Sequence, residues 1–480
     1  MGKHAWLFLW TAALLLLTVM VACTAVMVPL NGMLNHVSGV WIALAMDLSD
    51  GVFYRPILGE QGYGGVRYMP LHFVLHGGLI ALGMSPVHSG YLMTFVCAAG
   101  LFGGLYVLMW RLDVGWKLRI PCTLMVVGAL AVQLAVMGIR GDLLPAVLNI
   151  WGLAFCVAPE RKERGPNIPV ASLFFALAFL SKVTTVFGFL AACAALFLAG
   201  KRKTVWRLVA WTCGAVLFGF GIVYAASGGR VVTTMLVWTS GGTTVLELLT
   251  APLKALANVR DRPTLVLIVF TLAGLLSMGR GAWKELPTIA LVATAVVTIA
   301  IFGPPGTEYN HFLDLCLIAV VFLAVQVARG RIDTTLGTCL LALIALLGCE
   351  MPLVLCSRDV LMQKQHVRRE LATVISESRE PVLSEDPLLP VLAGRRSYVL
   401  DALTLRVICR RRPEVAEDLQ GRLHGRHFGA VILMEDPTMP MGRQRYRTTH
   451  FGTGFVEALL MGYRPAGRHG PYVVYRPAPQ

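Results

Sequence analysis

The sequence predicts an α-helical protein that crosses a membrane many times and ends in a small α/β module. Of its 480 residues, 56% are hydrophobic and only 14% are charged, whereas an average soluble domain has about 25% charged residues. The mean hydropathy is +0.67. Apolar runs approaching or exceeding the length that crosses a bilayer, about 20 residues, recur along the chain as far as residue 356 and are missing after it.

The formal net charge of +15 would suggest a nucleic-acid partner in a soluble protein. Here most basic residues fall in short clusters between apolar runs, which is typical of cytoplasmic loops. We therefore expect no nucleic-acid partner. The 11 cysteines are scattered through apolar stretches without the spacing of a zinc site, so no metal is expected from them. The clusters are Arg111/Lys117/Arg119, Arg161/Lys162/Arg164, Lys201/Arg202/Lys203, Arg280/Lys284 and Arg329/Arg331.

The basic clusters also constrain the number of membrane crossings. If every cluster is cytoplasmic, an even number of spans must separate any two of them. This rule predicts about eleven spans, with the N-terminus inside and the C-terminus outside. The spans are 6–30, 91–110, 120–137, 143–158, 168–180, 184–198, 205–224, 264–276, 286–302, 312–327 and 336–355.

Two segments are interpreted through the same rule. Residues 70–82 are apolar but too short for a span, so we expect a re-entrant or interfacial helix there. The apolar run 168–198 is broken by Lys182, which the rule assigns to the outer face together with the turns 138–142, 227–262 and 303–311.

The composition changes at about residue 357, where Arg, Glu, Asp and Pro become frequent. We expect a membrane domain over 1–356 and a separate extracytoplasmic module over 357–480. Helical patterns cover 360–377 and 415–424, and apolar strand patterns cover 381–384, 429–434 and 472–475. Their alternation predicts a small α/β fold.

The first outer loop, residues 31–69, is much longer than an ordinary connection, and long loops are often functional. A carboxylate at the membrane surface can act as a general base toward a hydroxyl, and a cation there can hold a lipid phosphate. The alternative is that Asp47 and Asp50 solvate an interfacial helix. The polar residues of this loop are His36, Asp47, Asp50, Glu60, Arg67 and Tyr68.

Three further polar groups are predicted on the same outer face, and isolated charges so close to hydrocarbon are candidates for function. Arg140 and Asp142 flank one turn, with a mutual ion pair as the alternative. Lys182 stands alone between apolar runs, with snorkelling to the headgroups as its alternative. The third group, which could instead form a polar cap for the next helix, comprises Glu308, Tyr309, Asn310 and His311.

Taken in order, these segments resemble an integral-membrane glycosyltransferase of the GT-C superfamily. The likeness is to family 39, which includes protein O-mannosyltransferases and lipid A aminoarabinose transferases, and it covers nearly the whole chain. It rests on the long first loop and on these segments: 67–71, Arg140-x-Asp142, Leu-Ser-Lys-Val-Thr (180–184), Tyr-Asn-His-Phe-Leu-Asp (309–314) and Pro-Val-Leu-Ser-Glu-Asp-Pro (381–387).

The resemblance implies transfer of a sugar from a polyprenyl-phosphate donor to an acceptor hydroxyl at the outer leaflet, with inversion at the anomeric carbon. It implies donor-phosphate contacts for Arg67 and Tyr68, with Arg140 and Lys182 as further donors. It requires no divalent metal and no other cofactor. The expected partners are membrane lipid, the donor, and a glycan, lipid or protein acceptor. We expect a bacterial inner membrane location, and substrate contacts from Asp142, Glu60, Glu308, Tyr309, Asn310 and His311.

The chain departs from the family at the expected base. Relatives usually carry Asp or Asp-Glu about ten residues before the position of Asp47, where this chain has Val37 and Ser38. Asp47 is the first candidate to replace that base, followed by His36 and Asp50. Loss of catalysis would leave a non-catalytic assembly subunit, and the rival class is a transporter or flippase for lipid-linked or anionic substrates.

Overall fold

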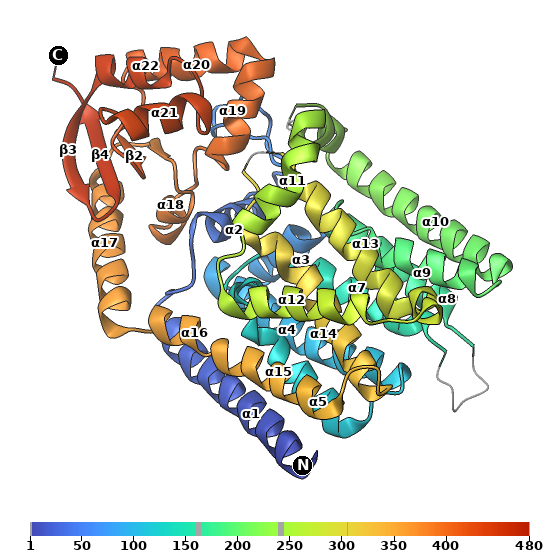
Figure 1. Cartoon of the computed structure of the whole chain (residues 1–480). Coiled ribbons are helices and arrows are strands. Elements are labelled where there is room, and N and C mark those ends of the chain that lie inside the picture. The colour runs from blue at the N-terminus through green and yellow to red at the C-terminus, as the bar shows by residue number, and fades with distance from the viewer. Residues whose placement is uncertain (1, 159–164, 239–243, 305, 480) are drawn as a thin grey trace. The chain divides into compact units, whose positions relative to one another are not determined.

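The computed structural model describes residues 2–158, 165–238, 244–304 and 306–479 (Figure 1). The predicted basic cluster of Arg161, Lys162 and Arg164 lies outside these residues. The chain forms two compact units. We call Met1–Pro29, Tyr91–Phe220 and Thr243–Ser357 the helical unit, and Leu30–Gly90, Gly221–Gly242 and Arg358–Gln480 the mixed unit.

Every segment predicted to span the membrane is helical in the structure, in agreement with the predicted fold class. The helices are α1 (Gly2–Met27), α4 (Pro86–Arg111), α5 (Trp116–Met125) with α6 (Leu130–Met137), α7 (Leu143–Cys156), α8 (Ile168–Ser181), α9 (Phe187–Leu198), α10 (Arg202–Ala226), α12 (Arg262–Leu276), α13 (Leu286–Ile301), α14 (Leu313–Ala328) and α15 (Thr334–Leu347) with α16 (Glu350–Leu355).

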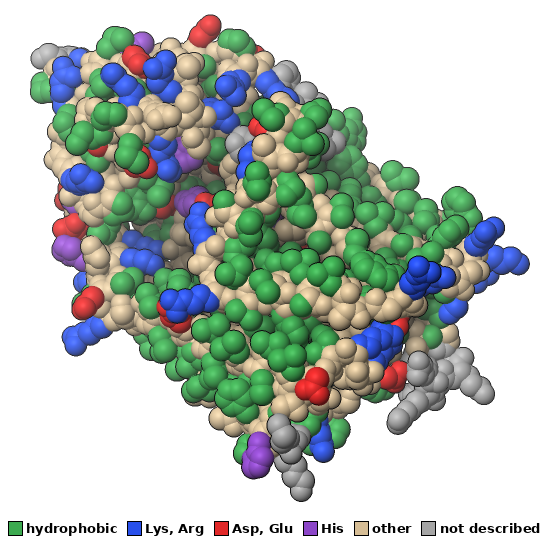
Figure 2. Space-filling view, viewed as in Figure 1, with side chains coloured by type: hydrophobic (Ala, Val, Ile, Leu, Met, Phe, Trp, Pro, Cys, Tyr) green, Lys and Arg blue, Asp and Glu red, His purple; other side chains and the backbone are tan. Residues whose placement is uncertain are grey.

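Among the described residues, five helices are long and apolar enough to cross a membrane, or six if one bent pair forms a single span. Helices α7, α8, α9, α12 and α13 are also apolar but have only 12 to 16 residues. Hydrophobic side chains cover much of the surface over α10 and α12 (Figure 2). Exposed leucines and valines are unfavourable in water, so this surface suits lipid.

The span predicted over 120–137 is not one straight helix, because α5 and α6 meet at 84° across the 3₁₀ turn η1 (Val126–Gly128). The sequence shows the apolar run, but it does not show that Gly348 packs against the break at Gly128. A Cβ atom on Gly348 would lie 2.4 Å from the Cα of Gly128. The Gln133 amide donates to the carbonyl oxygens of Gly128 (3.3 Å) and Gly348 (2.7 Å). Such bonds matter because unsatisfied backbone groups are costly inside a membrane.

The mixed unit contains a four-stranded sheet in the order β1-β2-β4-β3. β1 (Val382–Ser384) runs parallel to β2 (Ala430–Leu433), and β4 (Tyr472–Pro477) is antiparallel to both β2 and β3 (Tyr463–His469). The register pairs Leu383 with Val431. The predicted strands at 381–384, 429–434 and 472–475 are all present.

Both faces of this sheet are covered, which explains why β1 and β2 are buried along their whole length. Val382, Ile432 and Val474 pack with α17 (Arg358–Glu377) and α18 (Leu388–Leu392). Leu383, Val431 and Tyr475 pack with α19 (Ala402–Arg411), α20 (Pro413–His424), α21 (Pro440–Thr448) and α22 (Phe455–Gly462). The strands therefore alternate their side chains between two cores.

The long first loop folds as part of the mixed unit. Its helices are α2 (His36–Ser49) and α3 (Leu71–Ala81). Gly39 of α2 lies directly on α18, since a Cβ there would come within 2.2 Å of the Leu388 nitrogen. Tyr63 enters the core of the module, packs edge-on against Tyr398 and donates a hydrogen bond to Asp418 (2.6 Å).

The segment 227–262, which we expected to be an external turn, contains the π-helical η2 (Val232–Trp238) and α11 (Val245–Ala257). Thr244 and Glu247 form a capping box at the start of α11. Helix α11 was not predicted because Pro252 lies inside it and its leucines lie on an exposed face. Helices α18, α19, α21 and α22 and strand β3 were likewise not predicted.

Glu385, directly after β1, is the polar centre of the C-terminal module. Its carboxylate is 1% exposed and accepts hydrogen bonds from the Tyr446 hydroxyl (2.7 Å), the Met434 amide (2.7 Å) and the Arg445 guanidinium (3.0 Å). Nδ1 of His450 lies 2.5 Å away. Burial alone would raise the pKa of Glu385, but the contacts from His450 and these donors lower it to about 2.

Replacing Glu385 with Gln should lower the free energy of unfolding of this module by about 2–4 kcal/mol, because charged donors lose a buried partner. The depressed pKa sets the pH dependence. The stabilisation is present above the ordinary value of 4.5 and is lost as the pH falls toward about 2. Pulse proteolysis in urea measures both effects. Glu414→Gln, at an exposed pair, is the matched control; equal losses in both variants would contradict the assignment.

Candidate functional site

Three polar segments of the helical unit that are far apart in the sequence meet at Asp142. Asp142 precedes α7, Lys182 follows α8, and Asn310 lies in the 3₁₀ turn η4 (Tyr309–Phe312) that leads into α14. Lys182 Nζ donates to Asp142 Oδ1 (2.6 Å), and Asn310 Nδ2 donates to Asp142 Oδ2 (3.0 Å). The carboxylate therefore ties together the ends of three helices.

The backbone around Lys182 is fixed by local hydrogen bonds. Lys182 leaves α8 in an extended conformation. The Thr185 hydroxyl donates back to the carbonyl oxygen of Lys182 (2.6 Å), and the Asn149 amide of α7 donates to the carbonyl oxygen of Thr185 (2.9 Å). The ion pair is largely enclosed, with side-chain exposures of 22% for Lys182 and 13% for Asp142. Removing one partner of this enclosed ion pair therefore costs more free energy of unfolding than breaking a surface pair does.

Arg140 is a buried cation beside this pair. The residue is 5% exposed and close enough to Asp142 and Tyr309 to interact with both electrostatically. Within the described residues, its guanidinium makes no hydrogen bond and no ion pair. A buried charge without a hydrogen-bonded partner is unfavourable. Arg140 is therefore suited to holding an anion that comes from outside the protein.

The turn before α14 supplies the rest of the cluster. Tyr309 lies under the guanidinium of Arg260, 5.2 Å from it, and the ring of His311 packs edge-on against Phe302. Glu308 is exposed at the start of η4. Asp314, in the first turn of α14, interacts electrostatically with Lys182 and Asp142. Arg260 was missed because it lies in the segment interpreted as a turn.

Asp47, the first candidate for the base, is buried in the mixed unit. It is 2% exposed and its two carboxylate oxygens accept from Arg55, from Nη2 at 2.7 Å and Nε at 3.0 Å. Arg55 also donates to the Ser397 carbonyl oxygen (2.7 Å). Burial raises the pKa of Asp47 and the neighbouring Arg55 opposes that rise. The pair links the first loop to the C-terminal module. Arg55 was not singled out from the sequence.

The other predicted residues of the first loop are more accessible. Asp50 is 49% exposed and pairs with Arg396. His36 is exposed at the first turn of α2, and Glu60 and Arg67 are exposed in the segment between α2 and α3. The ring of Tyr68 packs at a tilt against that of Trp41, with ring centres 4.4 Å apart.

The structure decides three of the alternatives left open by the sequence. Asp47 does not solvate an interfacial helix, because it is buried. Lys182 does not simply snorkel, because its ammonium binds Asp142. Arg140 and Asp142 form no mutual ion pair in the described part of the chain; Asp142 pairs with Lys182 instead. Over the same residues, no group of three or more His, Cys, Asp or Glu side chains is arranged to hold a metal ion.

Lys182→Met should destabilise the helical unit by about 2–4 kcal/mol, since the enclosed carboxylate of Asp142 loses its cation. The double variant Lys182→Met/Asp142→Leu should recover part of this loss because no unpaired charge remains. Thermal unfolding of the purified protein in detergent measures both. Lys201→Met, at an exposed lysine, is the matched control; additive losses in the double variant would refute the coupling.

The fold can be compared with solved structures. No protein-family model matches the chain, and no curated protein matches its sequence. The crystal structure of ArnT from Cupriavidus metallidurans bound to undecaprenyl phosphate is similar over 97% of this chain and 99% of that chain, with a TM-score of 0.58 and 13% identity. The apo form of that protein gives a TM-score of 0.57 at 13% identity, with the same coverage.

A structure of the arabinofuranosyltransferase AftD from Mycobacteria is similar over 96% of this chain and 40% of that chain, with a TM-score of 0.49 and 14% identity. The likeness to ArnT extends over both units of the chain. Together with the apolar helices, it identifies a multi-pass membrane protein. The resemblance inferred from the sequence, to integral-membrane glycosyltransferases of the GT-C type, is thus confirmed at the level of the fold.

Proposed function

We propose that this protein is a glycosyltransferase that moves a sugar from a polyprenyl-phosphate carrier to a hydroxyl group of an acceptor. The observation that carries the proposal is Arg140, a buried cation without a hydrogen-bonded partner among the described residues. A lipid phosphate is an anion suited to such a site, since charge-assisted bonds to phosphate are among the strongest. The fold supports this choice because the similar ArnT structure contains undecaprenyl phosphate.

The reaction is a single displacement. The acceptor oxygen forms a bond to the anomeric carbon while the bond from that carbon to the phosphate oxygen breaks. The electron pair of the broken bond moves onto the lipid phosphate, and the hydroxyl proton moves to a base. Attack opposite the leaving group inverts the anomeric centre. Because phosphate departs readily, cations alone can stabilise it, and no divalent metal or other cofactor is part of the proposal.

The residues of the helical unit then have separate roles. Arg140 contacts the departing phosphate, and Lys182 adds positive charge while Asp142 holds it in place. Asn310 is positioned by the second oxygen of Asp142 and, with Tyr309, His311 and Glu308, is proposed to contact the sugar. In the mixed unit, Arg67 and Tyr68 remain proposed phosphate contacts and Glu60 a proposed substrate contact.

For the base we propose Asp50 in place of Asp47. A general base must come within about 2.6–3.2 Å of the hydroxyl that it deprotonates. Asp47 is enclosed and both of its oxygens bind Arg55, whereas Asp50 is half exposed. His36 is the exposed alternative. Asp47 is then a positioning residue that holds the loop through Arg55.

The proposed setting is the bacterial inner membrane. The N-terminus is placed in the cytoplasm and the C-terminal module outside, because the basic clusters between apolar helices favour the cytoplasmic side. The sugar and the acceptor class, whether glycan, lipid or protein, are to be identified by screening.

Arg140→Gln should weaken binding of undecaprenyl phosphate by about tenfold or more, because a charged contact to phosphate is lost. Arg140→Lys should retain part of the affinity. Binding to the full chain in nanodiscs is measured by microscale thermophoresis, with melting temperatures recorded for each variant. Arg207→Gln, an exposed arginine on α10, is the control. Unchanged affinity in a folded Arg140→Gln variant would exclude this phosphate contact.

Asp50→Asn should lower sugar transfer by about 10²–10⁴-fold while donor binding remains, as expected when a general base is removed. Transfer is followed as release of lipid phosphate from a panel of polyprenyl-phosphate sugars, with and without EDTA. Asp47→Asn should reduce stability and transfer together. Loss in His36→Gln but not in Asp50→Asn would move the base to His36. Donor binding without release in wild type would favour an inactive subunit or a transporter, to be separated by a flux assay.

A further inference from the structure

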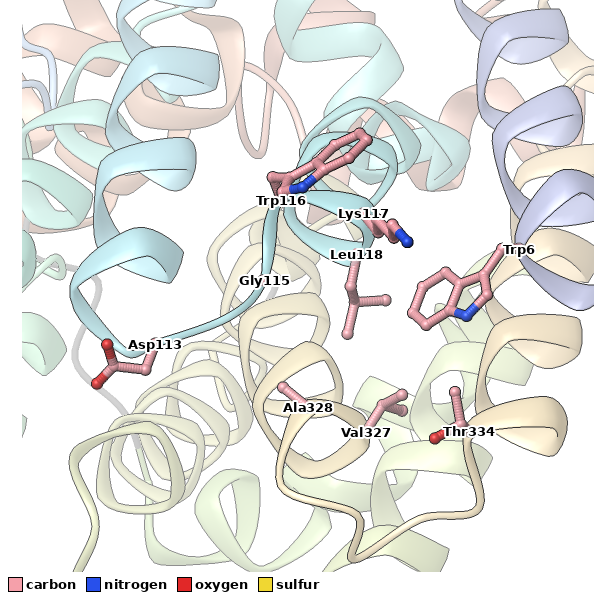
Figure 3. A pocket seen from close by; sticks show the side chains of 9 residues that line it. All are labelled: Trp6, Asp113, Gly115, Trp116, Lys117, Leu118, Val327, Ala328 and Thr334. Atoms are coloured by element: carbon pink, nitrogen blue, oxygen red, sulfur yellow. The ribbon is translucent and has the colours of Figure 1, made fainter. Parts of the chain in front are cut away.

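A pocket lies at the opposite end of the helical unit from Asp142. It has a volume of about 360 Å³ and lies between the beginning of α1, the start of α5 and the connection from α14 to α15 (Figure 3). Helix α14 has 16 residues and runs from Leu313, near the Asp142 cluster, to Ala328 at the pocket. At 1.5 Å per residue the two sites are about 24 Å apart.

The wall of this pocket is fixed by tryptophans. The indole nitrogen of Trp10 donates to the carbonyl oxygen of Lys117 (3.0 Å), and the ring of Trp10 packs edge-on against that of Trp116 at 6.2 Å. These contacts hold the start of α5 against α1. Trp116 is nevertheless 57% exposed, and Trp6 lines the pocket on the α1 side. Tryptophan is typical of the level of lipid headgroups.

The polar groups of the pocket favour an anion. Lys117 and Trp6 point toward one another above Leu118 and Val327 (Figure 3). Their ammonium and indole N–H groups are both donors. Lys117 is exposed, and no carboxylate of the described residues pairs with it. Asp113, the acidic residue of the lining, extends on the other side of Gly115 with its carboxylate turned away.

The surroundings strengthen this preference. Arg329 and Arg331, which follow α14, both pair with Glu285. Lys117 is the only cation among the described residues that line the pocket, and it has no carboxylate partner there. Helix α5 begins after Gly115, which provides no side chain to cap it. The positive end of that helix therefore adds to the charge of Lys117.

We propose that this pocket binds the phosphate of an anionic glycerophospholipid, with Lys117 and Trp6 donating to the phosphate and Leu118 and Val327 contacting the start of an acyl chain. Basic pockets between membrane helices commonly hold lipid headgroups. This site is distinct from the proposed donor site and does not depend on the proposed reaction.

Native mass spectrometry of the full chain in detergent tests the proposal. Phosphatidylglycerol, phosphatidylcholine with the same acyl chains, and inorganic phosphate are titrated separately. We expect phosphatidylglycerol to bind more tightly than phosphatidylcholine, and Lys117→Gln to weaken phosphatidylglycerol about fivefold. Trp6→Ala should weaken it as well. Because Lys117 is exposed, its variant should fold normally.

Lys203→Gln is the matched control, since it removes an exposed lysine from the start of α10, outside the pocket. Equal weakening in Lys117→Gln and Lys203→Gln would overturn the site. Equal affinity for the two lipids would overturn the preference for an anionic headgroup. Displacement of phosphatidylglycerol by an equal concentration of inorganic phosphate would identify a free-phosphate site and overturn the lipid assignment.

Discussion

The arrangement of the helical unit depends on the two hydrogen-bonded oxygens of Asp142. One binds the cation that follows α8 and the other binds the amide that precedes α14, so one carboxylate sets the relative positions of three helix ends. In an apolar bundle, packing alone discriminates weakly between neighbouring registers, whereas a charged group must reach its partner. The enclosed pair therefore fixes where Arg140 lies. Among the residues that the structure describes, Arg140 has no such partner, and this difference separates a structural charge from one suited to a ligand.

The sequence was sufficient to predict the apolar helices but not all of the side-chain pairings between them. Every segment predicted to span the membrane is helical in the structure, because hydrophobic length is a local property, although only five or six described helices are long and apolar enough to cross a bilayer. The motifs around Asp142, Lys182 and Asn310 were also identified, although the pairing of Lys182 with Asp142 was not. A mutual pair of Arg140 and Asp142 looked equally plausible, since two residues of one turn are always close in sequence. Which cation reaches the carboxylate is decided by how the helices pack.

The sequence of the first loop could not show which of its carboxylates is buried. Asp47 and Asp50 lie three residues apart on one helical segment, and both were candidates for the base. In the structure one is enclosed by Arg55 and the other is half exposed. The difference arises from residues more than 300 positions away, since Arg55 also binds Ser397 and Gly39 approaches Leu388. The break at Gly128 has a similar cause, because Gly348 lies far along the chain.

The many basic residues of this chain differ in whether a carboxylate pairs with them. Positive charge at the ends of membrane helices is expected for topology alone and carries little information about ligands. Glu285 satisfies both Arg329 and Arg331, and Arg55 is satisfied by Asp47. Of the cations proposed to bind a phosphate in the helical unit, Lys182 pairs with Asp142, whereas Arg140 and Lys117 have no carboxylate partner in the described residues. One is buried beside a cluster of polar side chains, and the other lines an open pocket between tryptophans. A buried cation favours a tightly held reacting phosphate, whereas an exposed one at the level of the headgroups favours an exchangeable lipid.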